Sequence, residues 1–201
     1  MFALVESGSI TKYLSGNQGI TLNDLQYPRA IYTLWTEAER NAIGIYSIVY
    51  DDTNKKDERW YKNTNQSYAF ANNKVTATYG SATAKAHADT TWTAQDEEDG
   101  LGTEGEVASR GLKYHLIKAV KLEAANELAR TDWYITRKTE KNTAIPSAIT
   151  THRNLVRSRQ AAMETAITNA SDTPALETLY TYTKDSDGVV SRPLAEIPTL
   201  D

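Results

Sequence analysis

The sequence predicts an α+β fold, in which a small N-terminal β-rich module precedes an antiparallel helical hairpin and an extended C-terminal arm. In the first half, short runs of β-branched and aromatic residues are separated by turns containing Gly, Asn and Asp. In the second half, apolar residues recur every three to four positions, which is the period of a helix. This periodicity ends near residue 170. The sequence therefore divides into a β-rich module (1–95), an acidic linker (96–106), a helical hairpin (107–170) and an extended arm (171–201).

The β-rich module is predicted from two hairpin signals. Apolar residues on both sides of Ser7-Gly8 predict two strands over residues 2–14, and the Gly- and Asn-containing stretch 15–28 is predicted as a loop. Residues 45–50 form a further β-branched and aromatic run. A second hairpin is expected from its alternating apolar pattern and its turn residues, with arms and turn at 59–70, 74–79 and Ala71-Asn-Asn73.

One short helix interrupts the strands. Thr36 and Glu39 have the spacing of a capping box, in which each satisfies a free backbone group of the other. We therefore expect a helix that ends near Ala42. Gly44 stands where a left-handed helix stop is favoured.

The stretch 96–106 carries six acidic residues and three glycines, and this composition is typical of a solvated linker. A calcium-binding loop is the alternative with the same composition. Its ligand spacing and closing glutamate are missing, so the linker is the interpretation we retain.

Two long helices are predicted after the linker. The first, over 107–130, is indicated by an apolar stripe and ends at Thr131 and Asp132. Ile145-Pro146 marks a boundary, because the residue before proline avoids the helical conformation. The second helix is expected from Ser147 to Asn169. The two stripes consist of Leu112, Leu116, Val120, Ala124 and Leu128 in the first helix and Ile149, Val156, Met163 and Ile167 in the second.

The final segment, 171–201, contains three of the five prolines and no helical period, so we expect an extended arm. A small hairpin is possible from Tyr180 to Val190 around Asp187-Gly188. The arm carries many apolar side chains for an extended segment. It is therefore expected to pack on the chain itself or on a partner.

Composition excludes several classes of function. The net charge is −4 and the pI about 5.5, a balance that does not favour nucleic acid as a partner. There are no cysteines, so disulfides and thiolate metal sites are excluded. No apolar run reaches the roughly 20 residues that span a membrane, and residues 1–10 do not have the pattern of a signal peptide.

No arrangement of reactive side chains predicts catalysis. The three histidines, His87, His115 and His152, have no partner at the spacing of known metal motifs. Nucleophile elbows, phosphate loops and dinucleotide fingerprints are not found. We therefore predict a protein that is not an enzyme, with no catalytic residue, no metal and no cofactor. Arg153, Arg157 and the nearby Arg159 are expected to complement acidic residues on a neighbouring helix or chain.

Aromatic residues supply the candidate interaction sites. The sequence has 12 Tyr and 4 Trp but 2 Phe, which suits either packed strands or an interface with one wet side. If aromatic side chains bind a partner, the expected ones are Trp60, Tyr61, Tyr68, Tyr180 and Tyr182. A second group forms a predicted structural corner between the long helices, with Trp133 as a buried core anchor. This corner consists of Thr131, Asp132, Trp133 and Arg137.

The sequence around this corner resembles a pattern found in a known protein family. In bacteriophage tail fibre assembly proteins and related small tail proteins, a helix ends in Leu-x-x-Thr-Asp-Trp, an Arg and a Glu follow, and Ile-Pro opens a helix with two Arg. This chain resembles that pattern over roughly residues 1–165. The matching residues are Leu128-Ala-Arg-Thr-Asp-Trp-Tyr134, Arg137, Glu140, Ile145-Pro146, Arg153 and Arg157, together with Phe2-Ala-Leu-Val-Glu-Ser-Gly-Ser-Ile-Thr-Lys-Tyr13, Gly44-Ile-Tyr46, Asn65-Gln-Ser-Tyr68 and Tyr79-Gly-Ser81.

The resemblance implies a structural or interaction protein of a phage tail, present in the virion tail and in the host cytoplasm during assembly. Its expected partner is a tail fibre or baseplate protein, with self-association through the helical hairpin as a further expectation. Two alternatives stay open. One is an assembly chaperone that is absent from the mature virion. The other is a glycan-binding receptor protein that stacks sugars on Trp35, Trp60 and Trp92.

Overall fold

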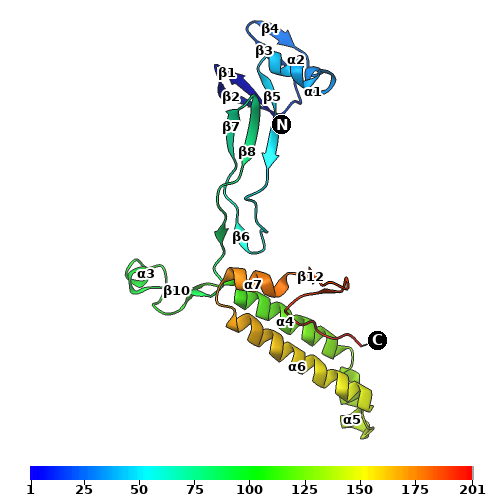
Figure 1. The fold of residues 1–201 in the computed structure, drawn as a ribbon. Coiled ribbons are helices and arrows are strands. Elements are labelled where there is room, and N and C mark those ends of the chain that lie inside the picture. The colour runs from blue at the N-terminus through cyan, green and yellow to red at the C-terminus, as the bar shows by residue number, and fades with distance from the viewer. Residues whose placement is uncertain (201) are drawn as a thin grey trace. The chain divides into compact units, whose positions relative to one another are not determined.

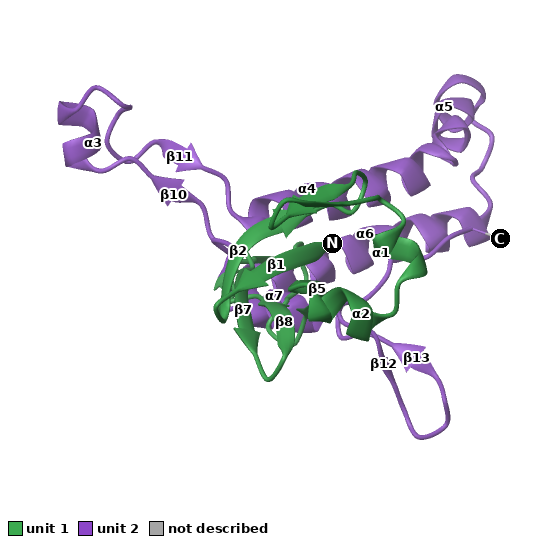
Figure 2. Cartoon of the chain, turned by 90° about the horizontal axis from the view of Figure 1, so that it is seen from above, with its two compact units in different colours: residues 1–83 green, residues 84–201 purple. Residues whose placement is uncertain are grey.

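The computed structural model describes residues 1–200 and divides the chain into two compact units, 1–83 and 84–201 (Figure 2). Strands dominate the first unit and long helices the second, so the predicted α+β class is confirmed. The boundary precedes residue 95, the predicted end of the β-rich module. Residues just before the acidic stretch belong to unit 2. The Leu112 N–H donates to the Ala86 carbonyl and the Lys113 N–H to the His87 carbonyl, at 3.0 Å in both cases.

Unit 1 is built on a five-stranded sheet with the order β2-β1-β5-β8-β7 (Figure 1). Neighbouring strands are antiparallel except β5 and β8, which run parallel. Both predicted hairpins are present, with left-handed turn residues at Ser7-Gly8 and Asn72-Asn73. The strands are β1 (Phe2–Glu6), β2 (Ser9–Leu14), β5 (Ile45–Asp51), β7 (Ser67–Ala71) and β8 (Lys74–Thr78).

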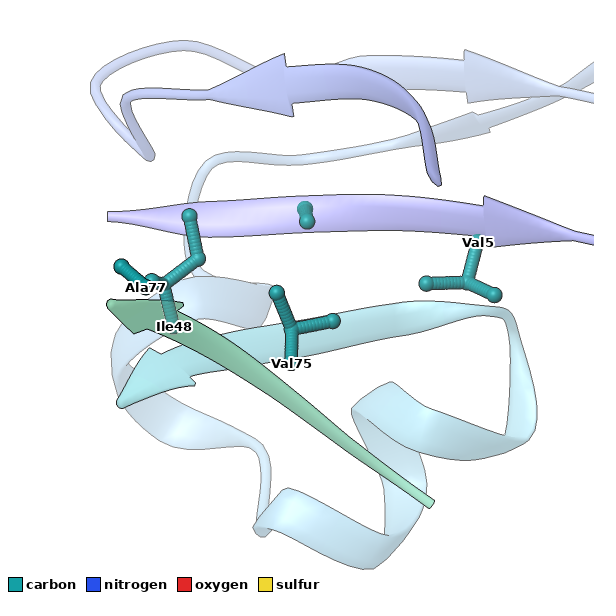
Figure 3. Packing of buried hydrophobic residues seen from close by; sticks show 5 residues of the cluster. Val5, Ile48, Val75 and Ala77 are labelled. Carbon is teal, nitrogen blue, oxygen red and sulfur yellow. The ribbon is translucent and has the colours of Figure 1, made fainter. Parts of the chain in front are cut away.

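Both faces of this sheet are packed, since successive side chains of a strand point to opposite sides. One face gathers a buried cluster of small and β-branched residues, shown in Figure 3. Its members are Ala3, Val5, Ile48, Val75 and Ala77. The opposite face holds a second cluster that includes two residues of the helix α1 (Ile31–Leu34). Its members are Leu4, Leu14, Ile31, Tyr32 and Ile45.

Short elements complete unit 1. The helix α2 (Glu37–Ala42) has the predicted capping box between Thr36 and Glu39. Gly44 follows with φ +80°, which confirms the predicted left-handed stop. A Cβ there would lie 2.7 Å from the carbonyl oxygen of Val5, a close approach that the sequence did not predict. The other short elements are β3 (Ile20–Leu22), β4 (Leu25–Tyr27), β6 (Tyr61–Lys62) and β9 (Thr83–Ala84), the last of which reaches the unit boundary.

Two predictions for unit 1 need correction. The predicted loop 15–28 contains the β3–β4 hairpin, which turns through Asn23 and Asp24, both at positive φ. Asparagine and aspartate tolerate this conformation better than other residues with a Cβ, which explains the turn. The predicted strand 59–70 is continuous only from Ser67, as β7.

Unit 2 contains the predicted antiparallel pair of helices, α4 (Leu112–Ala129) and α6 (Ser147–Asn169), which lie side by side (Figures 1 and 2). The helix α6 begins directly after Pro146, as predicted. The helix α4 begins five residues later than predicted, because Val107–Ser109 forms the strand β11. The buried residues of the pair come from both predicted stripes and include Val120, Ala124, Ile149, Val156, Met163 and Ile167.

The predicted acidic linker 96–106 is wrong as a description of this stretch. It forms most of a hairpin arm, with the strands β10 (Thr90–Thr91) and β11 and the helix α3 (Ala94–Glu98) between them. Thr93 and Asp96 form a second capping box at the start of α3. The indole of Trp92 covers Gly102 so closely that a Cβ there would lie 2.3 Å from its Nε1. Local capping and packing therefore order an acidic sequence.

The predicted extended arm 171–201 is not confirmed. Its first part is a helix, α7 (Thr173–Tyr180), which is capped by the Asp172 side chain. The expected small hairpin follows as β12 (Thr183–Lys184) and β13 (Val190–Ser191), turning around Asp187-Gly188. Only residues 192–200 contain no helix or strand. A further helix that the sequence did not predict, α5 (Asp132–Lys141), follows α4.

None of the helices formed by residues 1–200 combines the length and apolar character that a membrane crossing requires.

Candidate interaction surface

The base of the β12–β13 hairpin is held by an arginine between two tyrosines. The Arg192 guanidinium lies over the rings of Tyr180 and Tyr182, with its central carbon 5.4 and 5.2 Å from the ring centroids. Its Nε donates to the Leu194 carbonyl at 3.2 Å and is 3.5 Å from the Glu196 carboxylate. The arginine side chain is largely buried, so these cation–π contacts are shielded from water and are correspondingly stronger.

We call Arg192, Tyr180, Tyr182 and Glu196 the clamp of the hairpin. Its two tyrosines stay neutral at physiological pH. The Tyr182 hydroxyl donates to Glu196, and this hydrogen bond raises the pKa of Tyr182 because it stabilises the protonated hydroxyl. Burial raises the pKa of Tyr180. Both rings therefore act as packing and hydrogen-bonding groups, not as acids.

The hairpin carries apolar side chains outward from this base. Tyr182, Val189 and Val190 are 52%, 59% and 61% exposed. A hollow of about 250 Å³ lies beside them and is lined by residues of the hairpin and of the segment after it. We call Tyr182, Val189, Val190 and Arg192 the C-terminal hairpin surface.

The hairpin turn is fixed by one carboxylate. Asp185 accepts backbone N–H groups from Asp187 at 2.9 Å and from Val189 at 2.8 Å. This is the local hydrogen bonding that aspartate supplies in turns. The exposed valines are thus presented by an ordered turn, which lowers the entropy cost of binding.

Residues 192–200 attach the hairpin surface to the helices. Leu194 and Ile197 are buried, and the Leu194 N–H donates to the Leu179 carbonyl at 2.9 Å. At the end of the segment, the Leu200 N–H donates to Glu127 Oε1 at 2.8 Å, and its carbonyl accepts from Arg130 at 3.0 Å. Apolar contacts therefore hold the middle of this segment, and hydrogen bonds hold its end.

Glu127 is the centre of a buried polar network on α4. Its carboxylate accepts hydrogen bonds from Arg130, from the Leu200 N–H and from His152 Nε2, the last at 2.9 Å. Burial alone would raise the pKa of Glu127, but these hydrogen bonds outweigh it and the pKa is lowered. The carboxylate is thus ionised at neutral pH. Because an ionised carboxylate only accepts, Nε2 of His152 carries the proton.

Two of the four residues of the predicted structural corner, Thr131 and Asp132, are bound by Arg153. The buried guanidinium of Arg153 donates to the Leu128 carbonyl at 2.8 Å and to Thr131 Oγ1 at 2.7 Å, and it pairs with Asp132 at 2.9 Å. Arg153 on α6 thereby fixes the end of α4 and the start of α5. Of the three arginines predicted to complement acidic residues on a neighbouring helix or chain, Arg153 does so through Asp132. Arg157 and Arg159 form no ion pair with any of residues 1–200, and for them the prediction is not confirmed.

The prediction that Trp133 is a buried core anchor is wrong. Its ring is 52% exposed and stacks on Tyr134, with 3.8 Å between ring centroids. The Arg137 guanidinium lies over both rings, at 4.7 and 5.1 Å. The polar corner already closes the space between the helices, so the indole remains on the surface of α5. Arg137 accordingly belongs to this aromatic stack, whereas Thr131 and Asp132 bind Arg153.

The five predicted interaction residues are divided between the two units, with Trp60, Tyr61 and Tyr68 in unit 1 and Tyr180 and Tyr182 in unit 2. Tyr180 and Tyr182 lie in the clamp described above. Trp60 and Tyr61 are buried, and Tyr68 on β7 is half-buried against Tyr13, with 4.9 Å between the ring centroids. The expectation that Trp60 is exposed for stacking on sugars is therefore wrong. Trp35 and Trp92 are half-buried.

Arg192 and Glu196, which complete the clamp, were not predicted. They are four residues apart and form an ion pair, but the segment that holds them is not helical. A four-residue spacing indicates a contact only within a helix, so the sequence did not predict this pair. Their role depends on two tyrosines that precede them by ten residues or more.

Among residues 1–200, no group of three or more His, Asp or Glu side chains is placed to hold a metal ion. Comparison of the chain with protein-family models, with curated proteins and with solved structures found no match.

Proposed function

We propose that this protein is a non-enzymatic structural component of a bacteriophage tail, which binds a tail fibre or baseplate protein through the C-terminal hairpin surface. The observation that carries the proposal is the exposure of Tyr182, Val189 and Val190 on a hairpin whose base is rigidly clamped. Apolar and aromatic side chains next to an arginine are the composition of binding hot spots. The tail assignment is supported by the resemblance in the sequence around the corner of Thr131 and Asp132.

The geometry favours a protein partner over a sugar. Exposed valines provide apolar contact but no hydrogen bonds, whereas sugars require polar groups and flat aromatic faces. The unpaired backbone edge of a two-residue strand such as β13 also offers a short site for strand addition. A fibre or baseplate protein with an apolar pocket fits both features.

The first test is quantitative mass spectrometry of purified phage particles. We expect peptides of this protein at a fixed ratio to a known tail protein. Absence from particles, with the protein abundant in the infected lysate, would contradict the proposal and would favour a chaperone that leaves during assembly.

The second test assigns the surface. Val190→Asp places a charge in the apolar surface, and Leu122→Asp on α4 is its matched control because both residues are 61% exposed. We expect phage carrying Val190→Asp to lose at least 10-fold of this protein from the particle, as about 1.4 kcal/mol of binding free energy would require. Equal incorporation of both variants would refute the assignment of the surface.

A further inference from the structure

We propose that copies of this chain associate head to tail, with the acidic hairpin arm of one copy bound to the α5 end of the next. The acidic arm is residues 90–109, and the α5 platform is Trp133, Tyr134 and Arg137. Neither takes part in the C-terminal hairpin surface, so this inference goes beyond the proposed function and does not depend on it.

Among residues 1–200, no element buries the helix α5. None of its ten residues is buried, although it carries Trp133 and Ile135, which are 52% and 41% exposed. An isolated helix of this length is not stable in water. Within residues 1–200, α5 is attached chiefly at its first turn, where Asp132 pairs with Arg153. A surface of this kind is expected to be covered by another molecule.

The α5 platform is ordered before it binds. Tyr134 supports the indole of Trp133, and Arg137 lies against both rings. Arg137 and the neighbouring Lys138 and Lys141 form no ion pair with any of residues 1–200. Trp and Arg are the residue types that contribute most to protein–protein binding energy. The platform therefore offers an apolar face beside three unmatched positive charges.

Charge complementarity identifies the occupant. Residues 130–159 contain seven Lys or Arg and two acidic residues, whereas residues 90–109 contain six acidic residues and no Lys or Arg. At the tip of the arm, Leu101 is 60% exposed between acidic side chains that include Glu98 and Glu104. An apolar side chain flanked by carboxylates matches an aromatic face flanked by cations. A second copy of this chain thus presents a fitting partner.

Both features belong to unit 2 but lie at its opposite ends (Figures 1 and 2). The arm is joined to the start of α4 by Asp89, which pairs with Arg110 at 2.6 Å and accepts the Gly111 N–H at 2.8 Å. The helix α5 follows the other end of α4, which has 18 residues and is therefore about 27 Å long. The arm cannot fold back onto its own α5, so the contact joins different copies. Such head-to-tail contacts build closed rings or open chains.

The test uses two variants of the full chain that each disable one side of the contact. The arm variant is Leu101→Ser with Glu104→Gln, and the platform variant is Trp133→Ser with Arg137→Gln. All four side chains are at the surface or partly exposed, so circular dichroism is expected to show both variants folded like wild type. Mass in solution is measured by light scattering with and without nuclease treatment, over a range of protein and salt concentrations.

We expect wild-type protein to form oligomers that grow with protein concentration. The dissociation constant of the contact is expected to be at least 10-fold higher in 0.5 M salt than in 0.05 M salt. Each variant alone is expected to be a monomer. An equimolar mixture retains one intact arm facing one intact platform and is expected to form a 1:1 dimer and nothing larger. A monomeric wild type, a mixture that stays monomeric, a variant that still associates, or oligomers that disappear with nuclease would each overturn the proposal.

Discussion

Glu127 holds Leu200 on the helical hairpin, and replacing Glu127 tests this contact directly. Glu127→Ala removes the acceptor for the Leu200 N–H at 2.8 Å and for His152 Nε2 at 2.9 Å. A buried donor left without an acceptor costs about 1–3 kcal/mol. The ion pair with Arg130 adds less than about 1 kcal/mol, because the arginine side chain is 51% exposed. We expect Glu127→Ala to lower the unfolding free energy of unit 2 by about 1–4 kcal/mol, because the His152 donor stays buried whereas the part-buried Leu200 N–H can reach water.

The assay is urea unfolding followed by circular dichroism at 222 nm, which reports mainly on unit 2 because the long helices are there. Glu123→Ala is the matched control, since Glu123 lies one turn earlier on α4 and is exposed. Protection of the Leu200 amide from hydrogen exchange gives an independent measure of whether the chain end is docked. Equal stability of Glu127→Ala and Glu123→Ala, or an unchanged exchange rate at Leu200, would refute the role given to this carboxylate.

Three further predictions follow from the same contacts. The pKa of Glu127 is lower in the folded chain than its ordinary value of 4.5, so its contribution to folding stability is complete above pH 4.5 and is lost as the pH falls through the folded pKa. Acid titration of the hydrogen-exchange rate at Leu200 is expected to show this loss in wild type and not in Glu127→Gln. Trp133→Ala is expected to cost less than about 1 kcal/mol in the isolated chain, whereas Met163→Ala, at a buried site on α6, costs about 2–5 kcal/mol. Urea unfolding measures both variants, and the reverse order would contradict this. Gly44→Ala is expected to destabilise unit 1 by about 1–3 kcal/mol, because a Cβ would lie 2.7 Å from a neighbouring carbonyl oxygen at φ +80°. Hydrogen exchange of residues 1–83, followed as the temperature rises, measures this loss of stability. Unchanged protection of the β5 amides would contradict the prediction.

Features of the fold that depend on neighbours in sequence were predictable. The capping box of Thr36 and Glu39, the stop at Gly44 and the start of α6 after Pro146 each rest on residues within four positions of one another. The same holds for the turns of the N-terminal hairpin and of the β12–β13 hairpin. In all of these cases, a backbone group is satisfied, or a dihedral angle fixed, by a nearby side chain.

Features that depend on distant contacts were not predictable. The parallel pairing of β5 and β8 joins strands with β6 and β7 between them in the sequence, and no local pattern specifies it. The acidic composition of 96–106 predicted a linker, but the Thr93 cap and the packing of Trp92 on Gly102 order it. Composition reported the solvation of the side chains correctly and gave no information on the backbone.

Trp133 shows the same limit at the candidate surfaces. An indole after a helix end is usually buried, and this expectation assigned it to the core. The space between the helices is instead occupied by Arg153, whose guanidinium satisfies the Leu128 carbonyl and Thr131. Since one buried arginine closes the corner, the tryptophan is free to face solvent. That distribution could be learned only from the positions of both helices.

The segment 192–200 has two separable roles, and a truncation distinguishes them. Ending the chain after Arg192 removes the buried side chains of Leu194 and Ile197, which contribute about 1.5–3 kcal/mol each. It also removes Glu196, the acceptor of the Tyr182 hydroxyl, and the Leu194 carbonyl that accepts from Arg192, so the contacts that fix Arg192 and Tyr182 at the base of the hairpin are lost. Glu127→Ala, in contrast, releases only the last residues and leaves these contacts in place.

We therefore expect the truncation to abolish partner binding by the C-terminal hairpin surface and Glu127→Ala to preserve it, although both lower the stability of unit 2. Hydrogen exchange at Val189 and Val190 measures the order of the hairpin directly, and incorporation into particles measures binding. The truncated chain is expected to lose protection at both valines, while Glu127→Ala retains it. If Glu127→Ala also lost the protected hairpin, the hydrogen bonds at Leu200 would be what holds the surface in place, and the apolar contacts of Leu194 and Ile197 would be insufficient by themselves.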